Sequence, residues 1–310
     1  VAGGMLAPYS EGLEGDLLTF STESLSLYPE FLDRLGEVSK LSVSVRYGIL
    51  RLAVSEEEYD KIAKKINNLK TEVEKLDEAE LSRREPLLAG VFAGGFFFAR
   101  EGSVDTEKMM DALLFACENL KVSLIVDEIV EVCRKNEKID SVVGLKDTYN
   151  ADFYVFATGA WSRSLLGIPV LPVKGQILKI KGVELDRVYY SEVSYIIPKD
   201  NYVLVGATSE DAGFDGRVTL GGVKDLLDGA IRVMPSLSRA ELLGVRVGFR
   251  PATPDKKPIL WVGDNYAICT GHYRNGILWA PVSAHTILSF VERGERSPFF
   301  SAFSLGRFSE

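Results

Sequence analysis

The sequence predicts a mixed α/β (α+β) fold whose domains are discontinuous along the chain. With 310 residues and 46% hydrophobic side chains, the chain can bury a large core, in one big domain or two smaller ones. Strand-like and helical patterns mix without strict β-α-β alternation, which favours mixed layers. Glycine-rich stretches of the kind that lie against ligands occur near the start, in the middle and near the end, so each domain is expected to draw on several segments.

Apolar residues at helical spacing, together with capping residues, predict the helices. Ser55 with Glu58 is a capping-box pattern, Asp105 is a second cap, and Pro29 predicts a kink. The predicted helices cover 17–35, 55–69, 77–86, 105–116, 223–234 and a last segment that follows Gly276.

Stretches rich in β-branched and aromatic residues, bounded by turn residues, predict the strands. They cover 41–54, 90–99, 122–132, 141–145, 153–157, 171–180, 188–197, 202–205, 242–249 and 259–270. The first of these is either one strand or a hairpin that turns at Gly48.

Composition excludes several classes of protein. The formal net charge is −8, and an acidic surface repels nucleic acid and anionic membranes. No apolar run in the sequence is long enough to span a bilayer. Cys117, Cys133 and Cys269 are odd in number and widely spaced, as expected of reduced thiols in the cytoplasm. His272 and His285 are the only histidines and lack metal-ligand spacing, so we expect no metal site.

A polar, glycine-bounded loop, GHYRNG at 271–276, leads into the last predicted helix. The free N–H groups at a helix start carry partial positive charge and suit an anion. A plain polar loop before a core helix is the alternative interpretation. The buried face of this helix is expected to carry Ile277, Leu278, Ala284, His285 and Leu288.

Two other stretches would let a ligand approach the backbone. The strand at 153–157 ends in Ala-Thr-Gly (157–159), and ligands of open α/β sheets lie beyond the carboxyl ends of strands. The stretch AGGMLAP at 2–8 places small residues in succession. An ordinary strand-turn-helix and a structural loop are the respective alternatives.

Arg250 and Tyr195 are candidates for substrate contact. Arg250 lies between a strand and a proline-bounded turn in VGFRPATPD (247–255), and a guanidinium there can hold a carboxylate through two parallel bonds. A surface charge is the alternative. The segments YIIPK (195–199) and VLVGAT (203–208) form a predicted hairpin, in which a tyrosine most often serves packing.

Taken in order, these segments resemble the FAD-dependent glycine oxidases of the D-amino-acid oxidase family. GHYRNGILWAP (271–281) is similar to the family's C-terminal signature, and ATGAWS (157–162) to its second flavin-binding stretch. AGGML, PVKGQ (172–176), the hairpin and FRPATPD follow the family's order as well.

The resemblance implies an FAD-binding Rossmann-like domain and a discontinuous antiparallel-sheet substrate domain. The first is expected from 1–40, 90–170 and 246–300, and the second from 41–89 and 171–245. The family's Gly-x-Gly-x-x-Gly fingerprint does not occur in the sequence. We therefore expect an opening segment of roughly 30 residues or more to precede Val1, so that the FAD domain is N-terminally truncated here. Without that segment, FAD affinity and stability are expected to suffer.

The resemblance also implies roles for individual residues. Tyr195, Arg250 and Arg274 are expected at the substrate, with Arg250 on its carboxylate. FAD is expected to contact Ala2, Gly3, Gly4, Met5, Leu6, Ile129, Thr158, Gly159, Trp161, Gly271, His272, Arg274, Asn275, Gly276 and Ile277. For Ile129, a plain core position is an equal alternative. Ser209 stands where some glycine oxidases carry a larger apolar residue, which leaves the substrate size open.

The implied activity is FAD-dependent oxidative deamination of glycine, or of another small amine or amino acid, to the imine. The products would be glyoxylate, ammonia and, with O2 as acceptor, hydrogen peroxide, and the imine would serve thiamin thiazole synthesis. Sarcosine, D-amino acids and proline-like imino acids are alternative substrates, and a quinone is an alternative acceptor. Two alternatives are not enzymes: the chain could be a non-catalytic subunit of a heteromeric amine oxidase, or a fragment that does not fold alone. Members of the family commonly form homo-oligomers.

Overall fold

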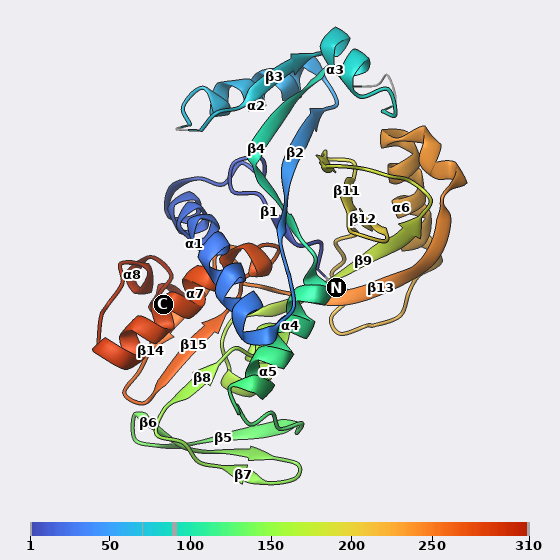
Figure 1. The fold of residues 1–310 in the computed structure, drawn as a ribbon. Coiled ribbons are helices and arrows are strands. Elements are labelled where there is room, and N and C mark those ends of the chain that lie inside the picture. The colour runs from blue at the N-terminus through green and yellow to red at the C-terminus, as the bar shows by residue number, and fades with distance from the viewer. Residues whose placement is uncertain (1, 70, 89–91, 309–310) are drawn as a thin grey trace.

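The computed structural model describes residues 2–69, 71–88 and 92–308, and it has the mixed α/β content that the sequence predicts (Figure 1). The helices are α1 (Gly15–Ser39), α2 (Glu56–Ile66), α3 (Glu78–Arg84), α4 (Thr106–Asn119), α5 (Ser162–Leu166), α6 (Leu220–Val233), α7 (Gly276–Arg293) and α8 (Phe299–Ala302). The strands are β1 (Met5–Leu6), β2 (Val45–Ala53), β3 (Glu74–Asp77), β4 (Gly94–Val104), β5 (Ile129–Lys135), β6 (Lys138–Gly144), β7 (Thr148–Tyr149), β8 (Tyr154–Phe156), β9 (Leu171–Lys181), β10 (Val188–Tyr190), β11 (Tyr195–Pro198), β12 (Val203–Gly206), β13 (Glu241–Ala252), β14 (Ile259–Val262) and β15 (Tyr266–Thr270).

The large sheet has the strand order β1-β4-β2-β10-β11-β12-β9-β13, and β3 adds beside β4. Among these pairs, β2 and β10 run parallel and the others antiparallel. Both faces of the sheet are covered, because Leu50 and Leu52 enter one apolar cluster while Ile49 enters another. Leu226 of α6 completes the first cluster, and Ile66 of α2 completes the second.

A smaller sheet with the order β14-β15-β8 lies beside helices α1, α4, α7 and α8 (Figure 1). Here β8 and β15 run parallel. Phe20 of α1, Met109 of α4 and Trp279 of α7 belong to one buried cluster with Leu260 of β14. A third sheet, β5-β6-β7, follows α4 in the chain. The predicted division into two domains at given boundaries stays a prediction.

Helix starts are fixed by the caps that the sequence predicts. The Ser55 hydroxyl accepts a hydrogen bond from the Glu58 N–H at 3.2 Å. Asp105 accepts from the N–H groups of Glu107 and Lys108, at 3.0 and 3.2 Å. Each bond satisfies a backbone donor that has no partner inside its helix.

Three predicted strands differ from the structure. The segment 259–270 is two strands, β14 and β15, because a turn at 263–265 is closed by the Gly263 N–H, which donates to the Tyr266 carbonyl at 2.8 Å. Residues 122–128 have no ladder partner among the described residues, and the strand begins only at Ile129. The segment 188–197 is two strands, β10 and β11, because Ser191 and Ser194 close a turn between them with a 3.0 Å backbone bond. Of the predicted strand 90–99, residues 90 and 91 lie outside the described residues.

The predicted buried face of α7 is right at its start and wrong further on, because Leu278 is fully buried and Ile277 packs against the same core cluster. Ala284, His285 and Leu288 are exposed, whereas Val282 and Thr286 are buried. The buried face continues from Leu278 through Val282 to Thr286 in steps of four residues, and it includes small polar residues whose bonds are made within the protein. The Val282 N–H, for example, donates to Ser24 Oγ of α1 at 3.2 Å.

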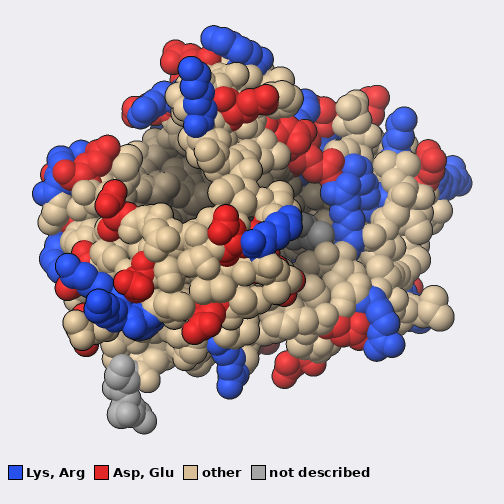
Figure 2. Space-filling model, turned by 90° about the horizontal axis from the view of Figure 1, so that it is seen from below, with Lys and Arg blue, Asp and Glu red and all other residues tan. Residues whose placement is uncertain are grey.

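The described part of the chain has no helix that is both long enough and apolar enough to cross a membrane. On the face shown in Figure 2, acidic and basic side chains are interspersed around a hollow.

Candidate functional site

The carboxyl ends of the parallel strands β8 and β15 are joined by hydroxyl groups. Ser162 Oγ lies 2.8 Å from Thr158 Oγ1 and 2.7 Å from Thr270 Oγ1, and Thr270 Oγ1 donates to the Gly159 carbonyl at 3.2 Å. Gly159 has φ +53°, and no atom lies within 4 Å of the place where a Cβ would be. The backbone after β8 therefore faces open space, as a ligand-binding turn requires.

The loop at 271–276 is fixed against the end of β13, the strand that carries Arg250. The Tyr273 N–H donates to the Pro251 carbonyl at 2.8 Å. Gly271 has φ +73°, and a methyl group there would lie 2.8 Å from Thr253 Cγ2. Helix α7 then begins at Gly276, and its cap residue Asn275 makes no side-chain capping bond. Its first N–H groups are thus available to an anionic group.

His272 is a neutral residue of this loop. Its Nε2 lies 3.0 Å from Ser283 Oγ and 3.9 Å from Cys269 Sγ. Burial lowers the pKa of His272 to about 4 and raises the pKa of Cys269 to about 11. Positive potential at this loop therefore comes from the helix start and from Arg274, rather than from imidazolium.

A buried lysine holds the N-terminal glycine loop. Lys199 Nζ donates to the carbonyls of Gly3, at 2.9 Å, and Val104, at 2.6 Å. Gly4 has φ +77°, and a methyl group there would lie 2.3 Å from the Val104 carbonyl oxygen, so only glycine fits. Burial lowers the pKa of Lys199 to about 8. The loop is therefore held rigidly against the end of β4.

Arg250 lies flat against a glycine of the neighbouring strand. A methyl group on Gly175 would lie 2.5 Å from Arg250 Nη2 and 2.7 Å from Nη1. Nη1 donates to the Thr208 carbonyl at 3.0 Å. Throughout residues 2–69, 71–88 and 92–308, no carboxylate forms an ion pair with Arg250. Because a guanidinium has five donors, most of them remain available to a ligand.

Tyr195 lies between two glycines and beside two arginines. A methyl group on Gly206 would lie 2.5 Å from the Tyr195 hydroxyl oxygen, and one on Gly3 would lie 3.6 Å from its ring. Burial raises the pKa of Tyr195, and the positive charges of Arg250 and Arg274 oppose that rise only in part. The hydroxyl therefore keeps its proton at neutral pH and can donate it in a hydrogen bond.

Arg274 is the second arginine of the group, and its charge acts on Tyr195. Its Nη2 lies 3.1 Å from Glu11 Oε1 and donates to the Tyr190 hydroxyl at 3.4 Å. The negative charge of Glu11 raises the pKa of Arg274.

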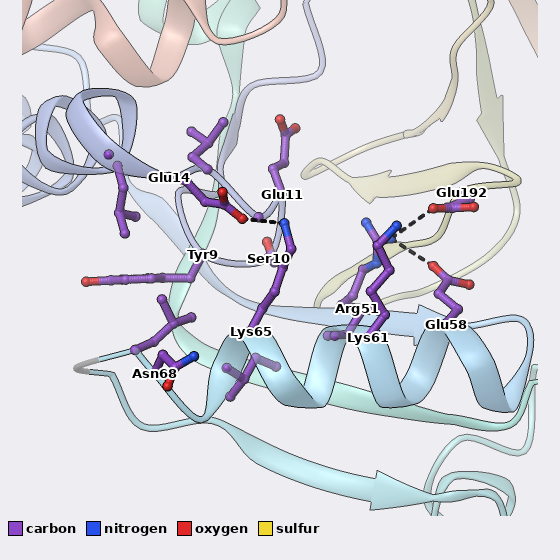
Figure 3. A pocket seen from close by; sticks show the side chains of 17 residues that line it. Tyr9, Ser10, Glu11, Glu14, Arg51, Glu58, Lys61, Lys65, Asn68 and Glu192 are labelled. Carbon is purple, nitrogen blue, oxygen red and sulfur yellow. Dashed lines mark hydrogen bonds and ion pairs between the residues drawn. The ribbon is translucent and has the colours of Figure 1, made fainter.

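A pocket of about 410 Å³ adjoins this pair, because Glu11 also lines it (Figure 3). Figure 3 shows Arg51 between Glu58, at 2.8 Å, and Glu192, at 3.8 Å. The guanidinium of Arg51 also lies over the Tyr190 ring, 4.5 Å from its centroid. The pocket and the pair of Arg274 with Glu11 therefore share a wall.

Trp161 is 56% exposed and stacks on an aromatic residue of another segment. Its ring lies 5.3 Å from Phe214 and 6.5 Å from Phe249. Phe214 belongs to the segment that follows β12, so this contact links the turn after β8 to the large sheet.

The remaining predicted cofactor residues lie at the edges of this group. The Ala2 carbonyl accepts from Thr106 Oγ1 at 3.2 Å. Met5 starts β1, and Leu6 is fully buried, so the Leu6 side chain serves packing. Ile129 starts β5 and packs in a cluster with residues of β8, apart from the arginines.

The structure brings Gly3, Tyr195, Arg250 and Arg274 together, and it joins the turn after β8 to β15. The open turn at Gly159, the free helix start of α7 and exposed Trp161 fit a long, partly flat anionic ligand, as FAD is. Among the residues present, the loops at 2–6, 158–161 and 271–277 would hold it.

Sequence reasoning missed Glu11 and Tyr190. Glu11 pairs with an arginine 263 positions away, and no local pattern signals such a contact. Gly175 and Lys199 did lie in motifs of the resemblance, but without a role. No group of His, Cys, Asp and Glu in the described residues could hold a metal ion.

Comparisons with known proteins agree with this geometry. The model of the DAO family, FAD dependent oxidoreductase, matches residues 1–289. The bifunctional protein ThiO/ThiG of Trichormus variabilis is 35% identical over 323 residues, which cover 100% of this chain but 49% of that protein. The chain thus spans about half the length of that relative. Glycine oxidase of Geobacillus kaustophilus is 31% identical, with 99% of this chain and 86% of that protein covered. The crystal structure of glycine oxidase from the same species matches with a TM-score of 0.93 and 29% identity, over 99% of this chain and 87% of that one.

Proposed function

Because the chain belongs to the DAO family of FAD-dependent oxidoreductases, we propose that it oxidises glycine, or a similarly small amino acid, to the imine. The single observation that carries this proposal is the setting of Arg250. Its guanidinium lies flat on Gly175 and is oriented by the Thr208 carbonyl, beside the Tyr195 hydroxyl and the N-terminal glycine loop. A carboxylate-binding group of fixed orientation next to that loop suits an α-amino acid with a small side chain.

In this proposal the protein contributes position rather than acid-base chemistry. Arg250 binds the substrate carboxylate through its free N–H groups, and the protonated Tyr195 hydroxyl donates a further hydrogen bond. Arg274 adds positive charge that Glu11 holds in place. Lys199 and the helix start of α7 contribute positive potential beside the loops at 2–6 and 271–277.

FAD, when bound, supplies the two-electron acceptor that takes the hydride from the substrate α-carbon. The imine then adds water and releases glyoxylate and ammonia. We further propose O2 as final acceptor, which is reduced to hydrogen peroxide, and thiamin thiazole synthesis as the use of the imine. Homo-oligomer formation and a cytoplasmic location stay predictions.

The test is an anaerobic glycine titration of the FAD-loaded protein, followed by visible absorbance. We expect glycine to bleach the oxidised-flavin bands. If sarcosine or a D-amino acid bleaches the bands and glycine does not, that compound is the substrate. If no amine bleaches them, the chain is better explained as a non-catalytic subunit.

The carboxylate assignment is tested by Arg250→Ala beside a matched control. Arg246→Ala removes an arginine from the same strand, where it pairs with Glu107 at the surface. We expect kcat/KM for glycine to fall by about a hundredfold or more in Arg250→Ala, since a charge-assisted pair is lost, and to stay unchanged in the control. Equal values for the two variants would show that Arg250 does not bind the substrate.

A further inference from the structure

The segment 207–219, which links β12 to α6, crosses next to Arg250 and is tied to β9. Its backbone continues the sheet: the Glu210 N–H donates to the Lys174 carbonyl at 2.9 Å, and the Lys174 N–H donates to the Glu210 carbonyl at 3.0 Å. The Thr208 N–H donates to the Gln176 carbonyl at 3.2 Å. We call this segment the strap.

The carboxylate of Glu210 is the centre of the strap's side-chain bonds. It accepts from Thr208 Oγ1 at 2.5 Å and from Gln176 Nε2 at 2.8 Å, and it lies 3.3 Å from Lys174 Nζ. Lys174 is 1% exposed, and Gln176 is fully buried. Burial alone would raise the pKa of Glu210, but these bonds and the Lys174 charge hold it below its usual value. Glu210 is therefore a carboxylate with fixed partners.

The far end of the strap is fixed by the same glutamine. Gln176 Nε2 also donates to Thr219 Oγ1 at 2.9 Å, and Gln176 Oε1 accepts from the Thr219 N–H at 3.0 Å. Thr219 in turn caps α6 through the Gly222 N–H. A methyl group on Gly222 would lie 2.1 Å from Gln176 Nε2, so this approach requires glycine.

These bonds end at Arg250. The strap residue Thr208 supplies the carbonyl that Arg250 Nη1 bonds at 3.0 Å, and the same residue bonds Glu210 through its hydroxyl. Gly175, on which the guanidinium lies, stands between the two β9 residues that hold Glu210. Both contacts that orient the guanidinium thus depend on one cluster, in which Lys174 and Gln176 are buried and Glu210 is partly exposed.

We infer that Glu210 is a positioning residue for the substrate carboxylate. It acts through Thr208 to set the orientation of Arg250 and touches no substrate itself. This inference rests on the proposed function, because Arg250 is taken to bind a carboxylate. It also implies that the strap, rather than β13 alone, determines how tightly short amino acids bind.

Glu210→Gln tests the inference in the FAD-loaded protein. The variant removes the charge opposite Lys174 and turns one acceptor into a donor, so the Thr208 carbonyl should shift. We expect KM for glycine to rise by about tenfold while kcat changes by less than about twofold. The affinity for acetate, measured by calorimetric titration, should fall by about the same factor. A loss of general stability would instead lower the melting temperature and kcat together.

Asp215→Asn is the matched control, because it makes the same acid-to-amide change in the same strap. The hydrogen bonds that the Asp215 carboxylate makes in the described residues go to Arg217, 2.8 Å away, and its charge acts on Lys174 of β9 only from a distance. It should leave both KM and acetate affinity unchanged. Glu210→Asp keeps the charge on a shorter side chain, so it should weaken glycine and acetate binding to an intermediate degree. It replaces Glu210→Gln in the test if that variant does not fold.

The outcomes separate the two proposals. In one outcome, glycine fails to reduce the flavin, while acetate binds to the unaltered protein and binds more weakly to Glu210→Gln. That result would rule out glycine as the substrate and support the role of Glu210. Equal acetate affinity in the unaltered protein, Glu210→Gln and Asp215→Asn would overturn the role of Glu210. Failure of the unaltered protein to bind acetate would overturn it together with the carboxylate role of Arg250.

Discussion

The setting of single residues in this site is decided by burial more than by residue type. His272 belongs to a motif of polar, chargeable residues, yet burial keeps it neutral at physiological pH. Tyr195 keeps its proton for the same reason, although two arginines lie nearby. A sequence motif names such residues without revealing their protonation, because burial depends on chain segments far away.

His272 should make the protein sensitive to acid. Its folded pKa of about 4 lies below the ordinary value of 6.5, so the unfolded chain holds more protons between these two values. The free energy of unfolding therefore falls as the pH is lowered from 6.5 to 4, by up to about 3 kcal/mol from this group. Urea unfolding at several pH values should show this slope reduced in His272→Gln.

His285 provides the control for that measurement. It is the only other histidine and is exposed on α7. His285→Gln should keep the full acid slope of the unaltered protein. A slope that is the same in both variants would assign acid sensitivity to other groups.

In the contact between α1 and α7, side chains of α1 bond to polar groups of α7 that have no partner within their own helix. Pro281 lies inside α7 and has no N–H to donate to the carbonyl of Ile277, four residues before it. The Tyr28 hydroxyl of α1 donates to that carbonyl instead. Ser21 of α1 likewise accepts from Trp279 Nε1 at 2.6 Å. The polar residues of the buried α1 face thus serve the helix that they pack against.

This arrangement predicts a coupling between two substitutions. Tyr28→Phe leaves the Ile277 carbonyl buried without a donor and should lower the free energy of unfolding by about 1–3 kcal/mol. In a Pro281→Ala background, the new N–H can bond that carbonyl, so the same change should cost close to nothing. Urea unfolding of the four proteins of the cycle measures the coupling. Equal costs in the two backgrounds would mean that the hydroxyl has no such role.

At the scale of the whole molecule, the candidate cofactor loops come from the start, middle and end of the chain. A ligand that contacts the loops at 2–6, 158–161 and 271–277 joins segments that are distant in sequence. FAD should therefore raise the melting temperature with increasing concentration, with a gain of about 2.7 kcal/mol at a hundred times its dissociation constant.

Paired glycines test the place of binding. Gly159→Ala and Gly167→Ala both put a side chain at a left-handed position, φ +53° and +70°, with no atom within 4 Å of the new methyl group. The backbone strain is thus matched, and only Gly159 lies in a predicted cofactor loop. The FAD-dependent shift in melting temperature should shrink in Gly159→Ala and persist in Gly167→Ala. Equal FAD-dependent shifts in the two variants would show that FAD does not bind at the turn after β8.

Much of this architecture could be predicted from the sequence, and the failures have a common cause. The caps at Ser55 and Asp105 depend on a few adjacent residues, so local patterns suffice for them. The ordered motifs predict the family, which the comparison confirms. Part of the buried face of α7 was predicted wrongly, because buried polar positions such as Ser283 depend on partners that helical spacing does not reveal. The pairing of Glu11 with Arg274 had no local signal either. A feature that depends on a bonding partner far along the chain cannot be predicted from local sequence patterns.

The bond between Tyr28 and Ile277 also has an evolutionary consequence. Proline at 281 is acceptable only while residue 28, 249 positions before the bonded carbonyl, offers a hydroxyl. A mutation at either position changes which residues are tolerated at the other. Across descendants of a common ancestral gene, loss of the tyrosine should accompany loss of the proline, so the two positions should covary.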